Sequence, residues 1–163
     1  MSSARFAHIE TNDTLPKLLR HNAKHHGGDV AQREKDRGLW KSYSWSDVHE
    51  RARLWGLGFK FMGAGRGDTI AIVGDSRPDW VAAAIGAHAV GAMTLGLYQD
   101  GLEAELSYLL AFAEVKVVVA ENEEQVDKIL RMADSAPSIK AIVYNDPRGM
   151  RKYNDPRLLH CDA

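Results

Sequence analysis

The order of apolar segments between residues 69 and 144 limits the fold more than any other feature of the sequence. Short apolar runs of strand length alternate there with longer segments whose apolar residues recur at helical spacing; the runs cover residues 69–73, 92–97, 115–120 and 141–144. Strands that alternate with helices through short connections are parallel and joined by right-handed crossovers. We therefore predict an α/β fold with a mainly parallel sheet, helices on both faces, and residues 141–144 as the last strand.

The chain before residue 69 does not continue this pattern. A first helix is predicted from Thr14, with Pro16 in its first turn, and a hairpin at 30–45. Ser44 and Asp47 have the spacing of a capping box at the start of a second helix. We expect this helix-hairpin-helix segment to precede the sheet, a boundary between two structural units near residues 63–68, and loop-rich ends over residues 1–13 and 145–163.

Two predicted helices carry strong burial signals. The second helix has an apolar stripe with spacings of 4, 3, 4 and 3, formed by Val48, Ala52, Trp55, Phe59 and Met62. We expect Trp55 and Phe59 to be buried on this stripe. A later helix at 79–90 is rich in alanine and apolar nearly all round, which predicts close packing between other elements.

Cap-like residue pairs, spaced by three positions, precede three further helices. They are Ser76 with Asp79, Asp100 with Glu103, and Asn122 with Gln125.

The composition excludes several classes of function. The formal net charge is −1, from 21 basic and 22 acidic side chains, whereas a nucleic-acid surface needs a strong basic excess. Cys161 is the only cysteine, so an internal disulfide is impossible and a reducing compartment fits best. The N-terminus lacks the apolar core of a signal peptide, and no apolar run approaches the roughly 20 residues that span a bilayer. We expect a soluble cytoplasmic protein with no transmembrane segment.

Two glycine-containing segments invite a ligand-binding interpretation. The glycines at 63–67 follow a helix and enter a strand, the reverse of a dinucleotide fingerprint, so a helix stop is preferred over phosphate binding. Gly74-Asp75-Ser76 has the correct order for a ligand loop at the carboxyl end of a strand. It lacks a second glycine and a lysine, so ordinary helix capping is preferred over ligand contact.

Two further residue patterns could carry chemistry. His21 and His25 lie four residues apart on a helix and could share a metal ion, but no carboxylate lies at ligand spacing, so a solvated helix face is preferred. No recognisable motif surrounds Cys161, which argues against a nucleophilic role.

Four groups of residues occur in the order found in one enzyme family. They are 43–48; 67–74 followed by Ser76-Arg77-Pro78-Asp79-Trp80; 89–100, ending Gly96-Leu97-Tyr98-Gln99-Asp100; and 121–129 followed by Tyr144-Asn145-Asp146-Pro147-Arg148-Gly149. Through them the chain from about residue 14 to 159 resembles the AMP-forming acyl-CoA synthetases, specifically the bacterial long-chain fatty acyl-CoA synthetase type. Ser76 departs from the asparagine that is commoner before the Arg-Pro pair.

The resemblance implies a ligase that uses ATP, Mg²⁺ and CoA to activate a fatty acid through an acyl-adenylate. The family's Ser/Thr/Gly-rich phosphate loop ends in Pro-Lys-Gly, and neither this loop nor the later motifs occur in the sequence. No catalytic, cofactor-binding or metal-binding residue is therefore carried over. We expect the chain alone to bind no cofactor and to be inactive.

Two hypotheses remain open at this point. The chain is either the N-terminal part of the ligase's catalytic domain, covering residues 1–163, or a stand-alone binding or interaction module derived from that family. Under the first hypothesis, uncovered sheet edges and apolar helix faces predict self-association.

Overall fold

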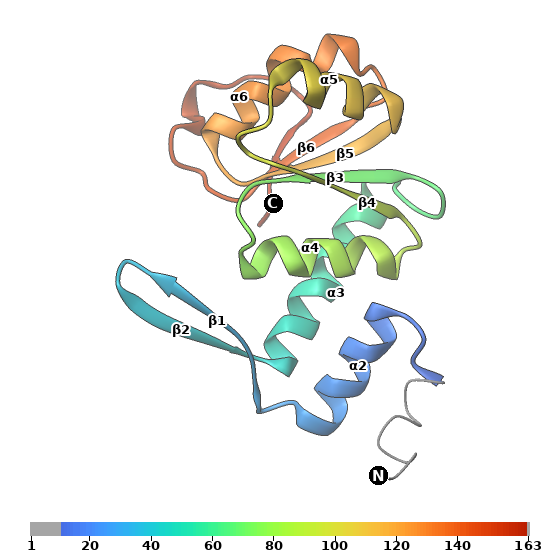
Figure 1. The fold of residues 1–163 in the computed structure, drawn as a ribbon, viewed down its shortest axis with the longest axis vertical. Helices are drawn as coiled ribbons and strands as arrows, with labels where there is room; N and C mark the ends of the chain where they lie inside the picture. Colours follow the sequence, from blue (N-terminus) through green and yellow to red (C-terminus); the bar gives the residue numbers. More distant parts are fainter. Residues whose placement is uncertain (1–10, 163) are drawn as a thin grey trace.

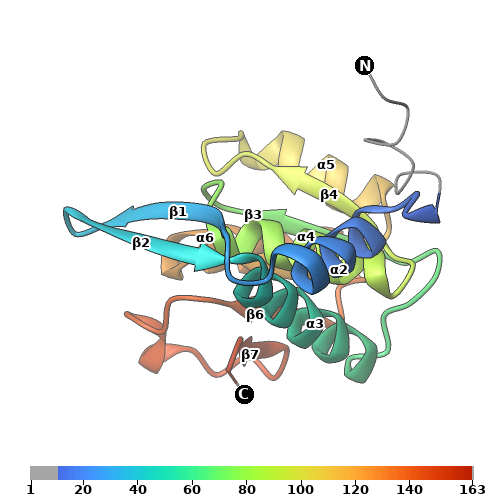
Figure 2. The ribbon, with the colours of Figure 1, turned by 90° about the horizontal axis from the view of Figure 1, so that it is seen from below.

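The computed structural model describes residues 11–162, which form a sheet covered by helices on both faces and a hairpin that projects from one side (Figures 1 and 2). The helices are α2 (Leu15–His26), α3 (Trp45–Phe61), α4 (Pro78–Ala89), α5 (Glu103–Phe112) and α6 (Glu123–Met132), with short 3-10 turns η2 (Ala133–Ser135) and η3 (Met150–Lys152). The strands are β1 (Val30–Asp36), β2 (Leu39–Ser44), β3 (Thr69–Val73), β4 (Met93–Leu97), β5 (Val115–Ala120), β6 (Ala141–Tyr144) and β7 (Leu158–His160).

The main sheet has the strand order β4-β3-β5-β6-β7, and every neighbouring pair is parallel. The predicted parallel α/β fold is confirmed. The prediction that residues 141–144 form the last strand is wrong, because β7 extends the sheet beside β6. This strand has only three residues in a polar, turn-rich tail, too few to show a strand period. The rest of the predicted loop-rich end, 145–157, contains η3 and turns.

Alternating side chains of the sheet point into two separate apolar clusters. On one face, sheet residues such as Val118 and Ile142 pack with Leu110 of α5 and Ile129 of α6. On the other face, sheet residues pack with α3 and α4; this cluster includes Phe59, Ile70, Ile72, Ala83, Ala87, Val117, Val119 and Val143. A third cluster joins Leu19 of α2 to Val48 and Ala52 of α3, so α2 forms an outer layer. Phe59 shares a cluster with the sheet, while the boundary near residues 63–68 stays a prediction.

Helices α3 and α4 cross at two glycines. A Cβ on Gly86 would lie 2.8 Å from the carbonyl oxygen of Ala52 and 2.8 Å from the nitrogen of Gly56, so only glycine permits this approach. The alanines of α4, including Ala82, Ala83 and Ala87, are buried, as the sequence predicted.

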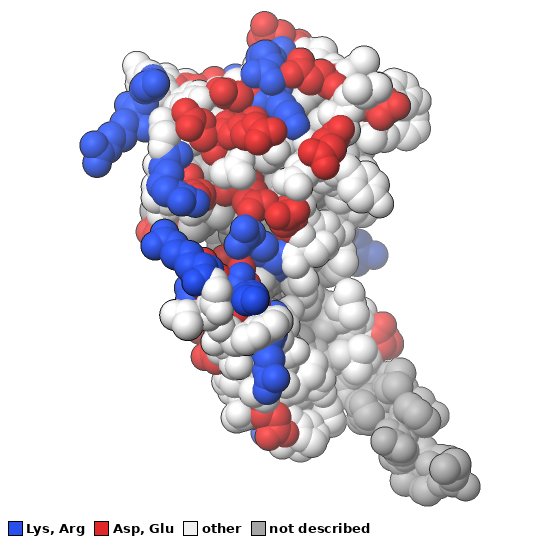
Figure 3. Space-filling view, turned by 60° about the vertical axis from the view of Figure 1, so that its left-hand side comes forward, with Lys and Arg blue, Asp and Glu red and all other residues white. Residues whose placement is uncertain are grey.

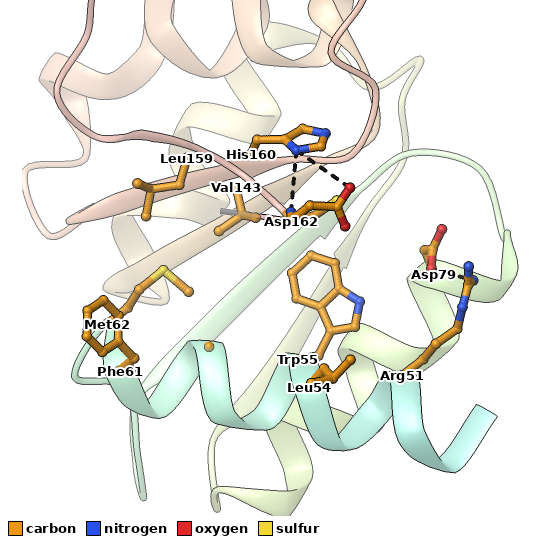
Figure 4. A pocket seen from close by; sticks show the side chains of 12 residues that line it. Arg51, Leu54, Trp55, Phe61, Met62, Asp79, Val143, Leu159, His160 and Asp162 are labelled. Atoms are coloured by element: carbon orange, nitrogen blue, oxygen red, sulfur yellow. Dashed lines mark hydrogen bonds and ion pairs between the residues drawn. The ribbon is translucent and has the colours of Figure 1, made fainter. Parts of the chain in front are cut away.

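The stripe on α3 is only partly buried. Val48, Ala52 and Phe59 are buried, but Trp55 and Met62 are half-buried, so the prediction of a buried Trp55 is wrong. Trp55 lies at the crossing, where a Cβ on Gly86 would be 2.8 Å from the Trp55 Cβ, and its ring lines a surface hollow (Figure 4).

The cap predictions are correct at two helices and wrong at two. The capping box of Ser44 and Asp47 is present, and Asn122 accepts a hydrogen bond from the Gln125 amide. Ser76 and Asp100 are not N-caps, because α4 begins after Arg77 and α5 begins after Leu102. The side chains of Arg77 and Leu102 make no capping hydrogen bond. Pro78 is the first residue of α4, which places the N-cap position at Arg77, one residue beyond Ser76.

The predicted loop-rich N-terminal end, 1–13, lies outside the described residues except for 11–13. Among helices of the described part, none is both long and apolar enough to cross a membrane.

We expect Phe59→Ala to lower the free energy of unfolding by about 3–5 kcal/mol, because the ring is fully buried between the sheet and α3. Phe61→Ala, two residues along the same helix, is the matched control. This side chain is 92% exposed, so its loss should change stability by less than about 0.5 kcal/mol. Urea unfolding of both variants measures the difference, and equal effects would contradict the described orientation of α3.

Candidate functional site at the carboxyl edge of the sheet

The direction in which strands are added reverses at β3. Strand β4 is added on one side of β3, and β5 is added on the other side after the chain crosses to the opposite face. The loops that follow β3 and β5 therefore lie side by side, and the Glu121 amide donates to the carbonyl of Val73 at 3.1 Å. Open α/β sheets commonly bind ligands at such a reversal, outside the carboxyl ends of the strands.

The Glu121 side chain fills this position. The Asp75 amide donates a 2.6 Å hydrogen bond to Oε2 of Glu121. Gly74 has φ +146°, and a Cβ at this residue would lie 2.6 Å from the Cβ of Glu121. Glycine at 74 thus lets the loop after β3 close directly on the end of β5.

Arg77 joins this loop to the hairpin. Its Nε donates to Glu121 Oε1 at 2.7 Å, and its Nη1 donates to Glu34 Oε1 at 3.1 Å. The other Glu34 oxygen accepts a 3.0 Å hydrogen bond from the Tyr43 hydroxyl. Burial alone would lower the pKa of Arg77, but the two carboxylates outweigh it and raise the pKa above its usual value. Arg77 is therefore held as a cation between two anions.

The same network reaches β4 and α6. Gln99 Nε2 donates a 2.9 Å hydrogen bond to Asp75 Oδ1, and the Lys128 ammonium donates to the Gln99 carbonyl oxygen. We name the connected set the edge network; its members are Glu34, Tyr43, Asp75, Arg77, Gln99, Glu121 and Lys128. It links the hairpin, the N-terminus of α4 and the carboxyl ends of β3, β4 and β5.

A second feature is an apolar hollow between α3 and the C-terminal end of the described chain (Figure 4). It has a volume of about 360 Å³ and is lined by Leu54, Trp55, Gly58, Phe61, Met62, Val143 and Leu159, with His160, Cys161 and Asp162 along one rim. At one end, Arg51 Nη1 donates to Asp79 Oδ1 at 2.7 Å, and the Arg51 guanidinium lies 4.9 Å from the centre of the Tyr43 ring.

A comparison with family models identifies the protein's class. The model described as "AMP-binding enzyme" matches residues 19–157, which is most of the chain. The chain belongs to the AMP-binding enzyme family. This agrees with the sequence resemblance at the level of the AMP-binding enzyme family.

Relatives in this family point to fatty acid–CoA ligases. The chain is 29% identical over 134 residues to a protein of Xenopus laevis named long-chain-fatty-acid–CoA ligase ACSBG2, covering 82% of this chain and 18% of the relative. It is 27% identical over 148 residues to the human protein of the same name, covering 90% of this chain and 22% of the relative. The chain thus spans about a fifth of the length of these curated relatives. Both relatives come from animals. The chain is therefore similar to proteins named long-chain fatty acid–CoA ligases, but the expected bacterial type is not supported.

Solved structures of two proteins named as CoA ligases share the fold. A putative long-chain-fatty-acid CoA ligase from Rhodopseudomonas palustris superposes with a TM-score of 0.76 at 19% identity, covering 91% of this chain and 35% of the other. The anthranilate CoA ligase AuaEII, in complex with anthranoyl-AMP, gives a TM-score of 0.73 at 19% identity and covers 79% and 24% of the two chains.

The edge network does not fit a bound nucleotide. The Asp75 amide, which a phosphate would need as a donor, already donates its hydrogen bond to Glu121. The carboxylates of Glu34 and Asp75 add further negative charge. Figure 3, which brings this side of the molecule forward, shows acidic and basic side chains interleaved rather than a continuous basic field. A triphosphate needs free amide donors and an excess of positive charge, so we assign no phosphate contact here.

The other segments considered as ligand or metal sites have structural roles in this chain. In the 63–67 segment, the Ala64 amide donates to the Phe59 carbonyl and Gly63 has φ +79°, so this segment ends α3, as predicted. His25 Nδ1 lies 2.8 Å from the His21 carbonyl oxygen near the C-terminus of α2. Within residues 11–162, the one group of three potential metal ligands within 4.8 Å of one another is His160, Cys161 and Asp162, so the two α2 histidines are outside it.

Sequence reasoning missed Glu34, which is one of several charged residues on β1 and has no motif around it. Its role becomes visible only when the hairpin folds against the start of α4. The motif residues Arg77, Gln99 and Glu121 were quoted for their family resemblance, and the structure brings all three into one network.

We expect Glu121→Ala to lower the free energy of unfolding by about 1–3 kcal/mol, because it leaves the Asp75 amide and Arg77 without their shared acceptor. Glu124→Ala is the matched control: this carboxylate is 71% exposed, and its ion pair with Lys128 is 3.4 Å long. Its loss should cost less than about 0.5 kcal/mol. Chemical unfolding of both variants distinguishes the two positions, and equal costs would argue against the edge network.

The thiol of Cys161 should react slowly at neutral pH. Burial against the hollow, followed by the negative charges of Asp162 and Asp79, raises its pKa to about 11, although the residue is exposed to reagents at the rim. The thiolate form therefore becomes abundant only as the pH approaches this value. Iodoacetamide alkylation should reach half its limiting rate near that pH, and Asp162→Asn should move this midpoint lower. A midpoint near about 8.5, the value of a free cysteine, would contradict the described environment.

Proposed function

We propose that residues 1–163 are the N-terminal part of the catalytic domain of an AMP-forming long-chain fatty acid–CoA ligase. The observation that carries this proposal is the family match over residues 19–157 together with relatives named as long-chain fatty acid–CoA ligases. The parallel sheet, shared with solved CoA ligases, supports it at the level of the fold.

The proposed reaction has two steps. The carboxylate of a fatty acid attacks the α-phosphate of ATP, which releases pyrophosphate and leaves an acyl-adenylate; Mg²⁺ neutralises the phosphate charge. The thiol of CoA then attacks the acyl carbon and displaces AMP. The edge network lacks the free amide donors and the excess positive charge that a nucleotide needs, so we assign it no step of this chemistry.

The contribution that we propose for this chain is structural. Its core supplies the sheet, and the edge network holds the loops after β3, β4 and β5 in one arrangement. A cytoplasmic location and the absence of a nucleic-acid partner belong to the same proposal, supported by the single cysteine and the net charge of −1.

We expect the 163-residue chain alone to be unable to form an acyl-adenylate. Adenylation develops charge on the transferred phosphate, and removing a single stabilising donor typically costs about 10²–10³ in rate. The sequence has no Ser/Thr/Gly-rich loop ending in Pro-Lys-Gly, and its edge loop after β3 is filled by Glu121. The whole set of phosphate-binding groups must therefore come from elsewhere.

Pyrophosphate exchange with ATP, Mg²⁺ and a long-chain fatty acid tests this proposal. The purified chain should give no exchange above a heat-killed control, while a chain extended through the phosphate loop and the later family motifs should give exchange. Exchange by the short chain would reveal an active site among these residues. Silence from both chains would favour the alternative, a stand-alone module derived from the family, or a different acid as substrate.

A further inference from the structure

Strand β4 leaves one edge of the sheet unpaired. Within residues 11–162, the only strand that pairs with β4 is β3, and β4 lies at the margin of the sheet (Figure 2). The Met93 amide donates to the Asp68 carbonyl at 2.9 Å, so Met93 directs its backbone groups toward β3. Because backbone groups alternate along a strand, Thr94 and Gly96 direct their N–H and C=O groups outward.

This edge lacks the features that usually prevent strand pairing. Residues 92–99 contain no charged residue and no proline, whereas natural edge strands commonly carry a lysine, a proline or a bulge. Strand β7 at the opposite edge differs: it has three residues and is preceded by the ion pair of Asp155 and Arg157. The open edge of β4 is therefore the better template for another strand.

Apolar side chains accompany the open backbone of β4. Met93 is 56% exposed and Phe112 of α5 is 74% exposed, and both line a shallow groove with Leu95. The Phe112 ring stacks on Tyr108, with centroids 5.6 Å apart. A strand that paired with β4 would cover this groove as well as satisfy the backbone.

We propose that the partner at this edge is the β4 strand of a second copy of the chain, paired antiparallel about a two-fold axis centred on Leu95. In this register Thr94 faces Gly96 of the second copy, and Gly96 faces its Thr94. Each pair exchanges two backbone hydrogen bonds, because these are the residues whose groups point outward. The two sheets then form one continuous sheet, and the two apolar grooves lie on the same face.

The charges at the two ends of β4 favour this partner. Arg66 lies against Gly91 in the turn before β4, where a Cβ on the glycine would be 3.3 Å from the Arg66 Cβ. Asp100 follows the other end of β4 and is exposed. Antiparallel pairing places the start of β4 in one copy beside the end of β4 in the other, so the Arg66 end of each copy lies next to the Asp100 end of the other. Asp68, also at the Arg66 end, is already paired with Lys116 at 3.0 Å.

The first test is the oligomeric state of the 163-residue chain, measured by sedimentation equilibrium over a range of concentrations. We expect a reversible dimer. Met93→Lys should weaken it by about ten-fold or more, because a lysine on an edge strand opposes pairing. Phe61→Lys is the control: this side chain is more exposed, at 92%, but lies on α3 away from β4, so the dissociation constant should stay the same.

The second test exchanges the two end charges. Arg66→Asp and Asp100→Arg should each weaken the dimer, because each places like charges together at both ends of the paired strands. The double variant restores an opposite pair at each end and should recover the wild-type dissociation constant. Circular dichroism and thermal unfolding verify that each variant is folded.

Three results would overturn the proposal. One is a strict monomer at the highest concentration at which the chain stays in solution. The second is dissociation by Phe61→Lys but not by Met93→Lys, which would move the interface to α3. The third is a double charge variant that associates no better than either single variant.

Discussion

Strand β3 is buried at all five of its residues, and the rest of the structure follows from the need to cover both of its faces. A strand without a solvent-facing side must lie inside the sheet, and helices must cover the sheet on each side. Helices α3 and α4 supply one cover, and α5 and α6 supply the other. Since the chain crosses from one face to the other between β4 and β5, the loops after β3 and β5 meet at one edge.

The cover on the α4 side is built from small residues. The alanines of α4 and the contact between Gly56 and Gly86 let α3 approach closely enough for Phe59 to reach the cluster of sheet side chains. Close packing of this kind tolerates little change in volume. Trp55 lies at this crossing but is only half-buried, because its ring lines the apolar hollow.

At the carboxyl edge, the chain fills with its own side chain the place where related architectures commonly bind ligands. Glu121 accepts from the Asp75 amide and from Arg77, and Arg77 extends the connection to Glu34 on the hairpin. These contacts join segments far apart in the sequence, so the motif residues that carry the family resemblance act here through the fold. In the full ligase that we propose, the edge network would hold the loops after β3, β4 and β5 in one arrangement.

The sequence by itself determined the parallel α/β architecture, because the apolar runs and the helical periods alternate over 69–144. It also determined the caps at Ser44 and Asn122, which depend on residues three positions apart. Only the tertiary structure decided the strand order, strand β7, the half-exposure of Trp55 and the partners of Glu34 and Glu121. Each of these features depends on contacts between segments that are far apart in the sequence, and local residue patterns do not predict such contacts. Glu121 lies 44 positions from Arg77, and Arg77 lies 43 positions from Glu34.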